Sequence, residues 1–545
     1  TVVLNFAPVD VVVREPDVAL TKSFAVANSD AADVLTVTVT ATNNGTAAAY
    51  NLRVLDDLVG SDLSYIAGSV SGTDPPDNVD TTTLGANQPI FSWNSVNPDY
   101  EILPTAVKTF TFNVRVDTTA QPLEILDNTI QAKWDSLPGQ NTALNASGVI
   151  GPDGNALGLR NGALPNAADA VNDYETSASA STSVLPLTIS KTDLVPTVVP
   201  TIGAHKNFQI EIALPEGTTN NLIVTDDLIF SGLSYFLSNN ATFDVTYTFQ
   251  NITTINGLPP AEAAFTAFPA DNASGSVVWN IGTVVTDEEN DTAVNAVNPV
   301  IRINYFARVN NDLLTDVGDT LQNSVTVNYS NAENDATEAL LATTHAVTVL
   351  ESLLTANKTV ANQTNPGVDP DGGDVLEYQI TINNTGNSTA FDVNIVDTLP
   401  PQLLFEAGSA TAEINAVAVA GFVATPTAAP AGPLVWGRGN ADNTLDIPAG
   451  GNLVLTYRTV VQAITEPNTT ISNSALIDWT SLDDSDLSGP FERTGAGCPA
   501  VTPPDDYCTA PAVTTINTID NNSIVKSIIL DTYDVAPSVS YTHLT

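Results

Sequence analysis

The chain has 545 residues, and its 61 acidic against 16 basic side chains give it a net charge of −45. A surface of this sign repels nucleic acid and anionic membranes, which argues against a nucleic-acid-binding protein. No apolar run reaches the roughly 18 residues that a membrane span requires. Because the sequence contains no methionine, we expect it to begin after processing or inside a longer protein.

Lysine is rare in this chain, yet four of its seven lysines recur at a nearly constant interval of 167 to 169 positions. Each of the four lies in a short run of residues typical of a strand. They are Lys22, Lys191, Lys358 and Lys526. A fixed period of this kind indicates tandem repeats.

The period also predicts the domain boundaries. We expect repeated domains at residues 16–185, 186–349 and 350–520. Residues 1–15 are predicted to be the closing strand of a preceding unit or an inter-subunit strand. Residues 521–545 are predicted to be the opening strand of a fourth, incomplete unit, or a strand donated to a neighbouring subunit.

The same elements follow each periodic lysine in the same order. An alternating strand enters a polar turn, a second strand ends in an aspartate, a third contains a tryptophan and a fourth contains an arginine. A last strand begins at an asparagine and ends at an aromatic residue. The aspartates are Asp56, Asp226 and Asp397; the tryptophans are Trp93, Trp279 and Trp436; the arginines are Arg115, Arg308 and Arg458; the asparagines are Asn128, Asn323 and Asn473.

Alternation with a period of two, in short runs separated by turn residues, is typical of a β-sandwich, and strong helical periodicity is absent. The predicted fold class is therefore all-β, with tandem Ig-like β-sandwich domains in an elongated array. The tryptophans and arginines are interpreted as core and sheet-face residues.

Unit three contains Asn-Asn-Thr-Gly386, Val-Asp397-Thr-Leu-Pro400 and Asn473-Ser-Ala. With the lysine and its alternating strand, these motifs resemble the bacterial and archaeal surface repeat named domain of unknown function eleven. Unit one is close to the pattern, whereas unit two departs from it with Pro-Glu-Gly217 in the turn. The resemblance implies Ig-like sandwiches of secreted adhesins, stalks and filaments, and it implies no particular ligand.

The order lysine, aspartate, asparagine also resembles the sets that form intramolecular isopeptide bonds in pilin and adhesin domains. There a neutral lysine attacks the asparagine amide, an aspartic acid polarises the carbonyl and moves protons, and ammonia leaves. The resemblance implies three cross-links, each with an aspartic acid. They are Lys22–Asn128 with Asp56, Lys191–Asn323 with Asp226, and Lys358–Asn473 with Asp397. The alternative is an ordinary salt bridge, or a lysine whose charge at the sheet edge prevents edge-to-edge aggregation.

Two local features suggest other chemistry. Cys498 and Cys508 flank a short loop, which predicts a disulfide and an oxidising, extracellular location. The loop with Asp369, Asp371 and Asp374 has carboxylates suited to Ca²⁺, although it lacks the twelve-residue calcium-loop pattern, and a solvated acidic turn is the alternative. No other cofactor is expected, and no catalytic motif indicates an enzyme beyond self-catalysed cross-linking.

The sequence therefore predicts an extracellular structural protein that forms or extends a cell-surface filament, stalk or sheath by head-to-tail association of its repeats. The alternative is an adhesin that contacts a glycan or a protein through variable loops. Units one and three share a related insertion after their last strand, with Leu-Arg160-Asn-Gly followed by Asp-Tyr174, and Glu-Arg493-Thr-Gly followed by Asp-Tyr507. Such loops are where repeat proteins vary and bind.

Overall fold

The computed structural model describes most of the chain, and two of the predicted segments lie partly or wholly outside it. Residues 10–15 of the predicted closing strand are described and form no strand, whereas 521–545, with Lys526, lie outside the described residues. The described residues are 10–93, 100–138, 174–228, 233–236, 245–270, 273, 275–286, 299–311, 315–331, 336–341, 345–483, 491–495, 498 and 507–520.

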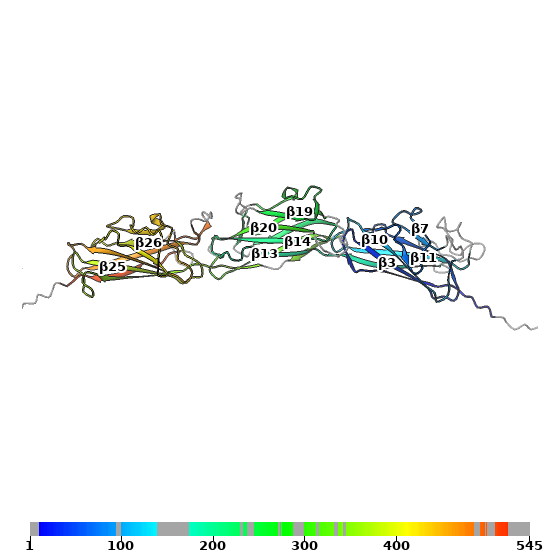
Figure 1. The fold of residues 1–545 in the computed structure, drawn as a ribbon, viewed down its shortest axis with the longest axis horizontal. Helices are drawn as coiled ribbons and strands as arrows, with labels where there is room; N and C mark the ends of the chain where they lie inside the picture. Colours follow the sequence, from blue (N-terminus) through cyan, green and yellow to red (C-terminus); the bar gives the residue numbers. More distant parts are fainter. Residues whose placement is uncertain are drawn as a thin grey trace, which may run out of the picture. The chain divides into compact units, whose positions relative to one another are not determined.

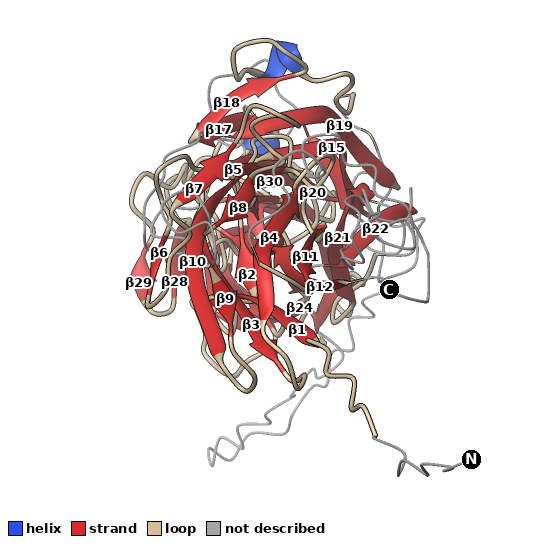
Figure 2. Cartoon of the chain, turned by 90° about the vertical axis from the view of Figure 1, so that its right-hand side faces the viewer, coloured by secondary structure: helices blue, strands red, loops and turns tan. Residues whose placement is uncertain are grey.

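Nearly all regular structure in these residues is β-strand (Figure 2). The helical pieces are two single 3-10 turns, η1 (Glu262–Ala264) and η2 (Arg438–Asn440). Within the described ranges no helix is long and apolar enough to cross a membrane. The strands form six sheets, two for each predicted repeat (Figure 1). The prediction of tandem β-sandwich domains is confirmed.

By their contacts the residues divide into two compact units. The first contains the first sandwich and most of the second, and the other contains the third sandwich together with residues 198–204 and 309–319.

The first sandwich pairs a five-stranded sheet with a seven-stranded one. The five-stranded sheet has the order β1 (Val18–Phe24), β3 (Val34–Asn43), β10 (Val107–Val116) and β5 (Leu63–Tyr65), with β6 (Ser71–Gly72) also on β10. The other has the order β2 (Asn28–Ser29), β12 (Glu175–Val184), β11 (Ile125–Asp135), β4 (Ala49–Asp57), β8 (Ile90–Ser92) and β7 (Asn78–Asp80), with β9 (Glu101–Ile102) on β4.

The second sandwich repeats this order of strands. One sheet runs β13 (Thr188–Asp193), β14 (His205–Ala213), β20 (Val300–Val309) and β16 (Leu233–Phe236), with β17 (Thr246–Gln250) on β20. The other runs β18 (Ile252–Ile255), β19 (Ser276–Thr286), β15 (Thr218–Asp227), β21 (Thr320–Asn331) and β22 (Ala336–Leu341), with β23 (His345–Thr348) on β21.

The third sandwich has the same plan. Its first sheet runs β24 (Leu354–Asn362), β25 (Val375–Asn384), β31 (Asn452–Val461), β28 (Thr411–Ile414) and β29 (Val417–Ala418), with β27 (Leu403–Phe405) on β31. Its second sheet runs β30 (Leu434–Gly437), β26 (Phe391–Thr398), β32 (Thr470–Thr480) and β33 (Ala512–Asn517).

Alternation along the central strands separates core from surface. In β3 and in β25 every second residue is buried, because successive side chains of a strand point to opposite faces. Trp93, Trp279 and Trp436 are at most 3% exposed and lie in the cores, as predicted.

The periodic lysines occupy one equivalent position in all three sandwiches. Each lies on the edge strand of its sheet and is paired through the neighbouring strand to an apolar residue of the third strand. The paired sets are Lys22, Val39 and Phe110; Lys191, Ile210 and Ile303; and Lys358, Ile380 and Leu455. This shared register lets residues of different sandwiches be compared position by position.

Candidate functional site: a buried lysine, aspartate and asparagine in each sandwich

The predicted lysine, aspartate and asparagine meet in the interior of every sandwich. The lysine comes from the edge strand of one sheet, and the two partners come from adjacent strands of the facing sheet. These strands are β1 with β4 and β11, β13 with β15 and β21, and β24 with β26 and β32. A bond between lysine and asparagine would therefore connect the two layers of the sandwich.

In the third sandwich, Lys358 Nζ lies 2.6 Å from Asp397 Oδ2, and neither side chain has any exposed surface. The hydroxyl of Tyr457 donates a hydrogen bond to the same carboxyl group. Asn473 Nδ2 in turn donates to the Tyr457 hydroxyl at 3.0 Å. The tyrosine thus bridges the aspartate and the asparagine amide.

In the second sandwich, Lys191 Nζ donates to Asp226 and also to Asn323 Oδ1, the latter at 2.5 Å. The amine therefore lies beside the carbonyl group that it would attack. Tyr305 donates to Asp226 Oδ2 and accepts a 3.0 Å bond from Asn323 Nδ2, as Tyr457 does in the third sandwich.

The first sandwich holds the same three residues without a tyrosine. Lys22 Nζ lies 2.5 Å from Asp56 Oδ1, and both side chains are fully buried. Asn128 Nδ2 donates directly to Asp56 Oδ2 at 3.2 Å. The tyrosines are not among the site residues that the sequence pattern predicts. The signal that could have found them is their register: Tyr305 and Tyr457 lie two residues beyond the apolar partner of the lysine, where the first sandwich has Phe112.

Burial changes the protonation of both ionisable groups. Loss of hydration lowers the pKa of Lys22, Lys191 and Lys358 to about 8, although each aspartate opposes the shift. Burial also raises the pKa of the three aspartates, against the opposing effect of the lysines. Both shifts favour a neutral pair, in which the proton has moved from the ammonium group to the carboxylate.

Several buried oxygen atoms of these sites have no hydrogen-bond partner among the described residues. They are Asn128 Oδ1, Asn473 Oδ1 and Asp397 Oδ1. An unsatisfied buried acceptor costs about 1–3 kcal/mol. In the first sandwich the asparagine amide turns Nδ2 toward the aspartate, and in the third it turns Nδ2 toward the tyrosine hydroxyl.

The disulfide between Cys498 and Cys508 is present, with the two Cα atoms 6.0 Å apart. The predicted calcium residues, in contrast, do not converge on a common point. The Asp374 carboxylate accepts hydrogen bonds from Asn362, Asn365 and the backbone N–H of Asp371. Across the described ranges, no group of three acidic, histidine or cysteine residues could hold a metal ion. The Asp374 carboxylate therefore stabilises its own turn through hydrogen bonds within the loop.

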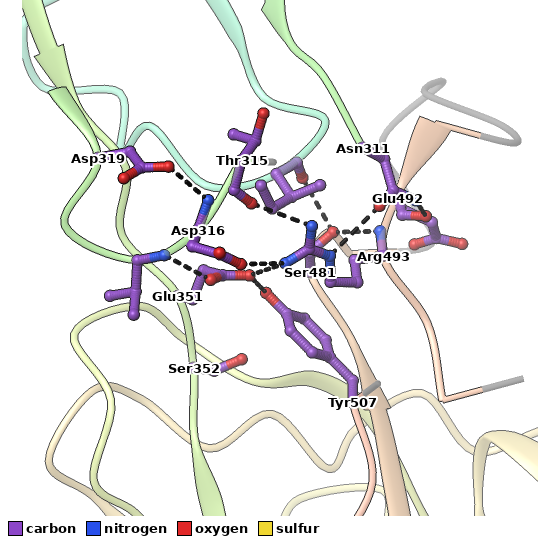
Figure 3. A network of polar contacts seen from close by, with 12 residues as sticks. Asn311, Thr315, Asp316, Asp319, Glu351, Ser352, Ser481, Glu492, Arg493 and Tyr507 are labelled. Atoms are coloured by element: carbon purple, nitrogen blue, oxygen red, sulfur yellow. Dashed lines mark hydrogen bonds and ion pairs between the residues drawn. The ribbon is translucent and has the colours of Figure 1, made fainter. Parts of the chain in front are cut away.

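A second buried polar cluster lies in the compact unit that contains the third sandwich (Figure 3). Arg493 donates to Glu351 at 2.7 Å and to the backbone carbonyl of Thr315 at 3.0 Å. Tyr507 donates to the same Glu351 carboxylate at 3.0 Å. The Arg493 side chain is 2% exposed. The described residues of the insertion in the third sandwich therefore form part of this buried polar cluster.

The described parts of the two related insertions share a ring-stacking contact. Tyr507 stacks on Trp479 at 5.2 Å between ring centres, and Tyr174 stacks on Trp134 at 5.9 Å. Arg160, the counterpart of Arg493, lies outside the described residues.

Comparison with known proteins adds little to this description. No family model matches the sequence, so the resemblance to the surface repeat family is not confirmed, and no curated protein matches either. Similar solved structures include the major pilin BcpA of Bacillus cereus, at 10% identity, with 94% of this chain and 99% of that chain covered and a TM-score of 0.26.

Two further solved structures are similar at the same level. The major pilin SpaD of Corynebacterium diphtheriae has 10% identity, coverage of 90% and 93%, and a TM-score of 0.22. The C-terminal domain of the antigen I/II polypeptide BspA of Streptococcus agalactiae has 11% identity, coverage of 60% and 99%, and a TM-score of 0.24. Sequence identities and TM-scores this low support no conclusion about function. The sandwich fold is assigned from the strand order of the sheets themselves.

Proposed function

We propose that this chain is an extracellular structural protein in which a lysine–asparagine isopeptide bond cross-links each sandwich. The observation that supports the proposal is the threefold recurrence of a fully buried lysine–aspartate pair in contact with an asparagine, at one register of the fold. The disulfide supports an oxidising, extracellular location.

A purely structural ion pair explains this arrangement less well. Removing two charges from water costs several kcal/mol for each ion, and a buried pair is often no more stabilising than apolar residues of the same size. A reactive site, by contrast, needs the lysine to lose its charge, and burial shifts the lysine pKa in that direction. It also needs an amide carbonyl beside the amine, as at Asn323.

The proposed reaction joins Nζ of lysine to Cγ of asparagine and breaks the bond between Cγ and Nδ2. The neutral amine attacks Cγ, and the aspartic acid supplies a proton to the departing nitrogen and takes one from Nζ. One proton moves from Nζ to Nδ2, ammonia leaves, and the aspartic acid is regenerated. No oxidant or cofactor is required.

The cross-link fits a protein that resists force. It would tie the edge strand of one sheet to an interior strand of the other, so that tension passes through a covalent bond. Head-to-tail association of repeats into a surface filament, stalk or sheath is part of the same proposal. Negative-stain microscopy that shows only separate particles at high concentration would count against the filament.

Intact mass spectrometry tests the cross-links directly. After reduction of the disulfide, the full chain is expected to be lighter than its sequence by three ammonia molecules. Lys358→Ala is expected to abolish one of these losses. The matched control is Lys108→Ala, because Lys108 forms a partly exposed ion pair with Asp74 and should leave all three losses intact. A wild-type mass equal to that of the unmodified sequence would refute the proposal.

A further inference from the structure

The three sites differ at a position of the third strand that contacts the reacting atoms. Two residues beyond the apolar partner of the lysine, the third strand of the sheet carries Tyr305 in the second sandwich and Tyr457 in the third. The first sandwich has Phe112 at the equivalent position. Both tyrosine hydroxyls lie between the carboxyl group of the aspartate and Nδ2 of the asparagine.

Nδ2 is the nitrogen that must leave as ammonia in the proposed reaction. In the second and third sandwiches this nitrogen contacts the tyrosine hydroxyl at 3.0 Å. In the first sandwich Asn128 Nδ2 contacts Asp56 directly. The fold thus contains two arrangements of one site, and they differ in the group that faces the leaving nitrogen.

We infer that Tyr305 and Tyr457 are catalytic residues that relay a proton from the aspartic acid to the departing ammonia, whereas Asp56 protonates it without a relay. The inference rests on the proposed cross-linking function. It assigns a role to two residues that the lysine, aspartate and asparagine set does not include.

The proton transfers balance as follows, with the second sandwich as the example. Neutral Lys191 attacks Cγ of Asn323, which leaves a positive charge on Nζ and a negative charge on Oδ1. The Tyr305 hydroxyl gives its proton to Nδ2 and receives the proton of Asp226, and the Asp226 carboxylate takes one proton from Nζ. Oδ1 then reforms the carbonyl and expels ammonia. Tyrosine and aspartic acid both end in their starting protonation states.

The surroundings of Tyr457 suit this role. Burial is the main reason that the pKa of Tyr457 lies well above its ordinary value, and the nearby Asp397 carboxyl raises it further. The hydroxyl therefore keeps its proton until it transfers that proton to the departing nitrogen. The ring stacks on Tyr378 with 5.4 Å between ring centres, which fixes its orientation and excludes water. A relay that is held in place adds little reorganisation cost to proton transfer.

A domain-resolved rate measurement tests the relay. The full chain is translated in vitro, translation is stopped, and samples are quenched in acidic urea at intervals. Digestion and mass spectrometry then quantify the branched peptide of each sandwich. Tyr305→Phe is expected to slow linkage of the second sandwich about 100-fold, and Tyr457→Phe that of the third, as for loss of a general acid. Linkage of the other sandwiches should keep its wild-type rate.

The matched control is Tyr329→Phe, since Tyr329 is a fully buried tyrosine of β21 outside the site, and it should leave every rate unchanged. Phenylalanine at the relay position is compatible with the fold, as Phe112 demonstrates. Replacing all tyrosines by the more acidic 3-fluorotyrosine gives a second measurement, in which the rates of the second and third sandwiches should change and that of the first should not.

The outcomes separate the two proposals. Wild-type rates in both Tyr→Phe variants, or an equal effect of 3-fluorotyrosine on all three sandwiches, would overturn the relay while leaving cross-linking intact. Absence of branched peptide from every sandwich of the wild-type chain would refute cross-linking itself, and the relay with it.

Discussion

When the second sandwich is pulled from handles on either side of it, the cross-link is expected to prevent most of its residues from extending. Lys191 and Asn323 are 132 residues apart, and an extended residue spans 3.3–3.6 Å, so the bond would withhold about 450 Å of contour length. Asn323→Ala removes the acceptor and leaves the Lys191–Asp226 pair in place. The variant should release the withheld length in one unfolding event, recorded by single-molecule force spectroscopy.

A second asparagine of the same strand provides the control for this measurement. Asn331 is also buried in β21, and its amide donates a hydrogen bond to Glu338. Asn331→Ala should weaken the domain by about 1 kcal/mol, as for loss of one hydrogen bond, without lengthening its extension. A wild-type second sandwich that extends as far as the Asn323→Ala variant would contradict the cross-link.

The main parts of the site could be predicted because they depend on period and alternation. A repeat of fixed length places Lys22, Lys191 and Lys358 at one register, and alternation decides which side chains enter the core. The aspartates and asparagines lie at matching places in strands that the pattern also predicts. Their contact distances depend on how two sheets pack face to face, and no single strand encodes that packing.

The tyrosines and the calcium residues show where a sequence pattern is not sufficient. Phe112, Tyr305 and Tyr457 are all aromatic core residues by pattern, and only the structure shows two hydroxyl groups bridging an aspartate and an asparagine. The loop around Asp374 suggested calcium because its carboxylates are close in sequence. Asn362 and Asn365 supply amide donors to the carboxylate, so the charge is satisfied within the loop.

The polar cluster around Glu351 depends on residues far apart in sequence. Glu351 and Arg493 are 142 residues apart, and the arginine belongs to an insertion with no strand pattern of its own. Its position near a disulfide and a stacked Trp479–Tyr507 pair follows from tertiary packing alone. The described residues of the insertion contribute to a buried polar cluster, and its role as a variable binding loop stays a prediction.

Arg493→Met is expected to lower the free energy of unfolding of this compact unit by about 3–5 kcal/mol, because it leaves Glu351 buried without its cation. For a unit of this size the loss corresponds to a fall in Tm of roughly 10 °C, measured by scanning calorimetry. The matched control is Arg458→Met. Arg458 is 50% exposed in its pair with Glu377, and its replacement should cost at most about 1 kcal/mol.

The pH dependence of the Arg493→Met variant identifies the cause of its instability. Burial raises the pKa of Glu351, and Arg493 is the largest opposing influence. Without the arginine the pKa rises further, so the folded variant prefers a protonated Glu351. A group whose pKa is raised on folding contributes stability at low pH and loses it as the pH rises through the folded pKa.

The loss of unfolding free energy in Arg493→Met, relative to wild type, should therefore be smaller at pH 4 than at pH 7. The double variant Arg493→Met/Glu351→Leu should recover most of this free energy. An equal deficit at both pH values would show that Arg493 stabilises the unit by packing and not by its charge.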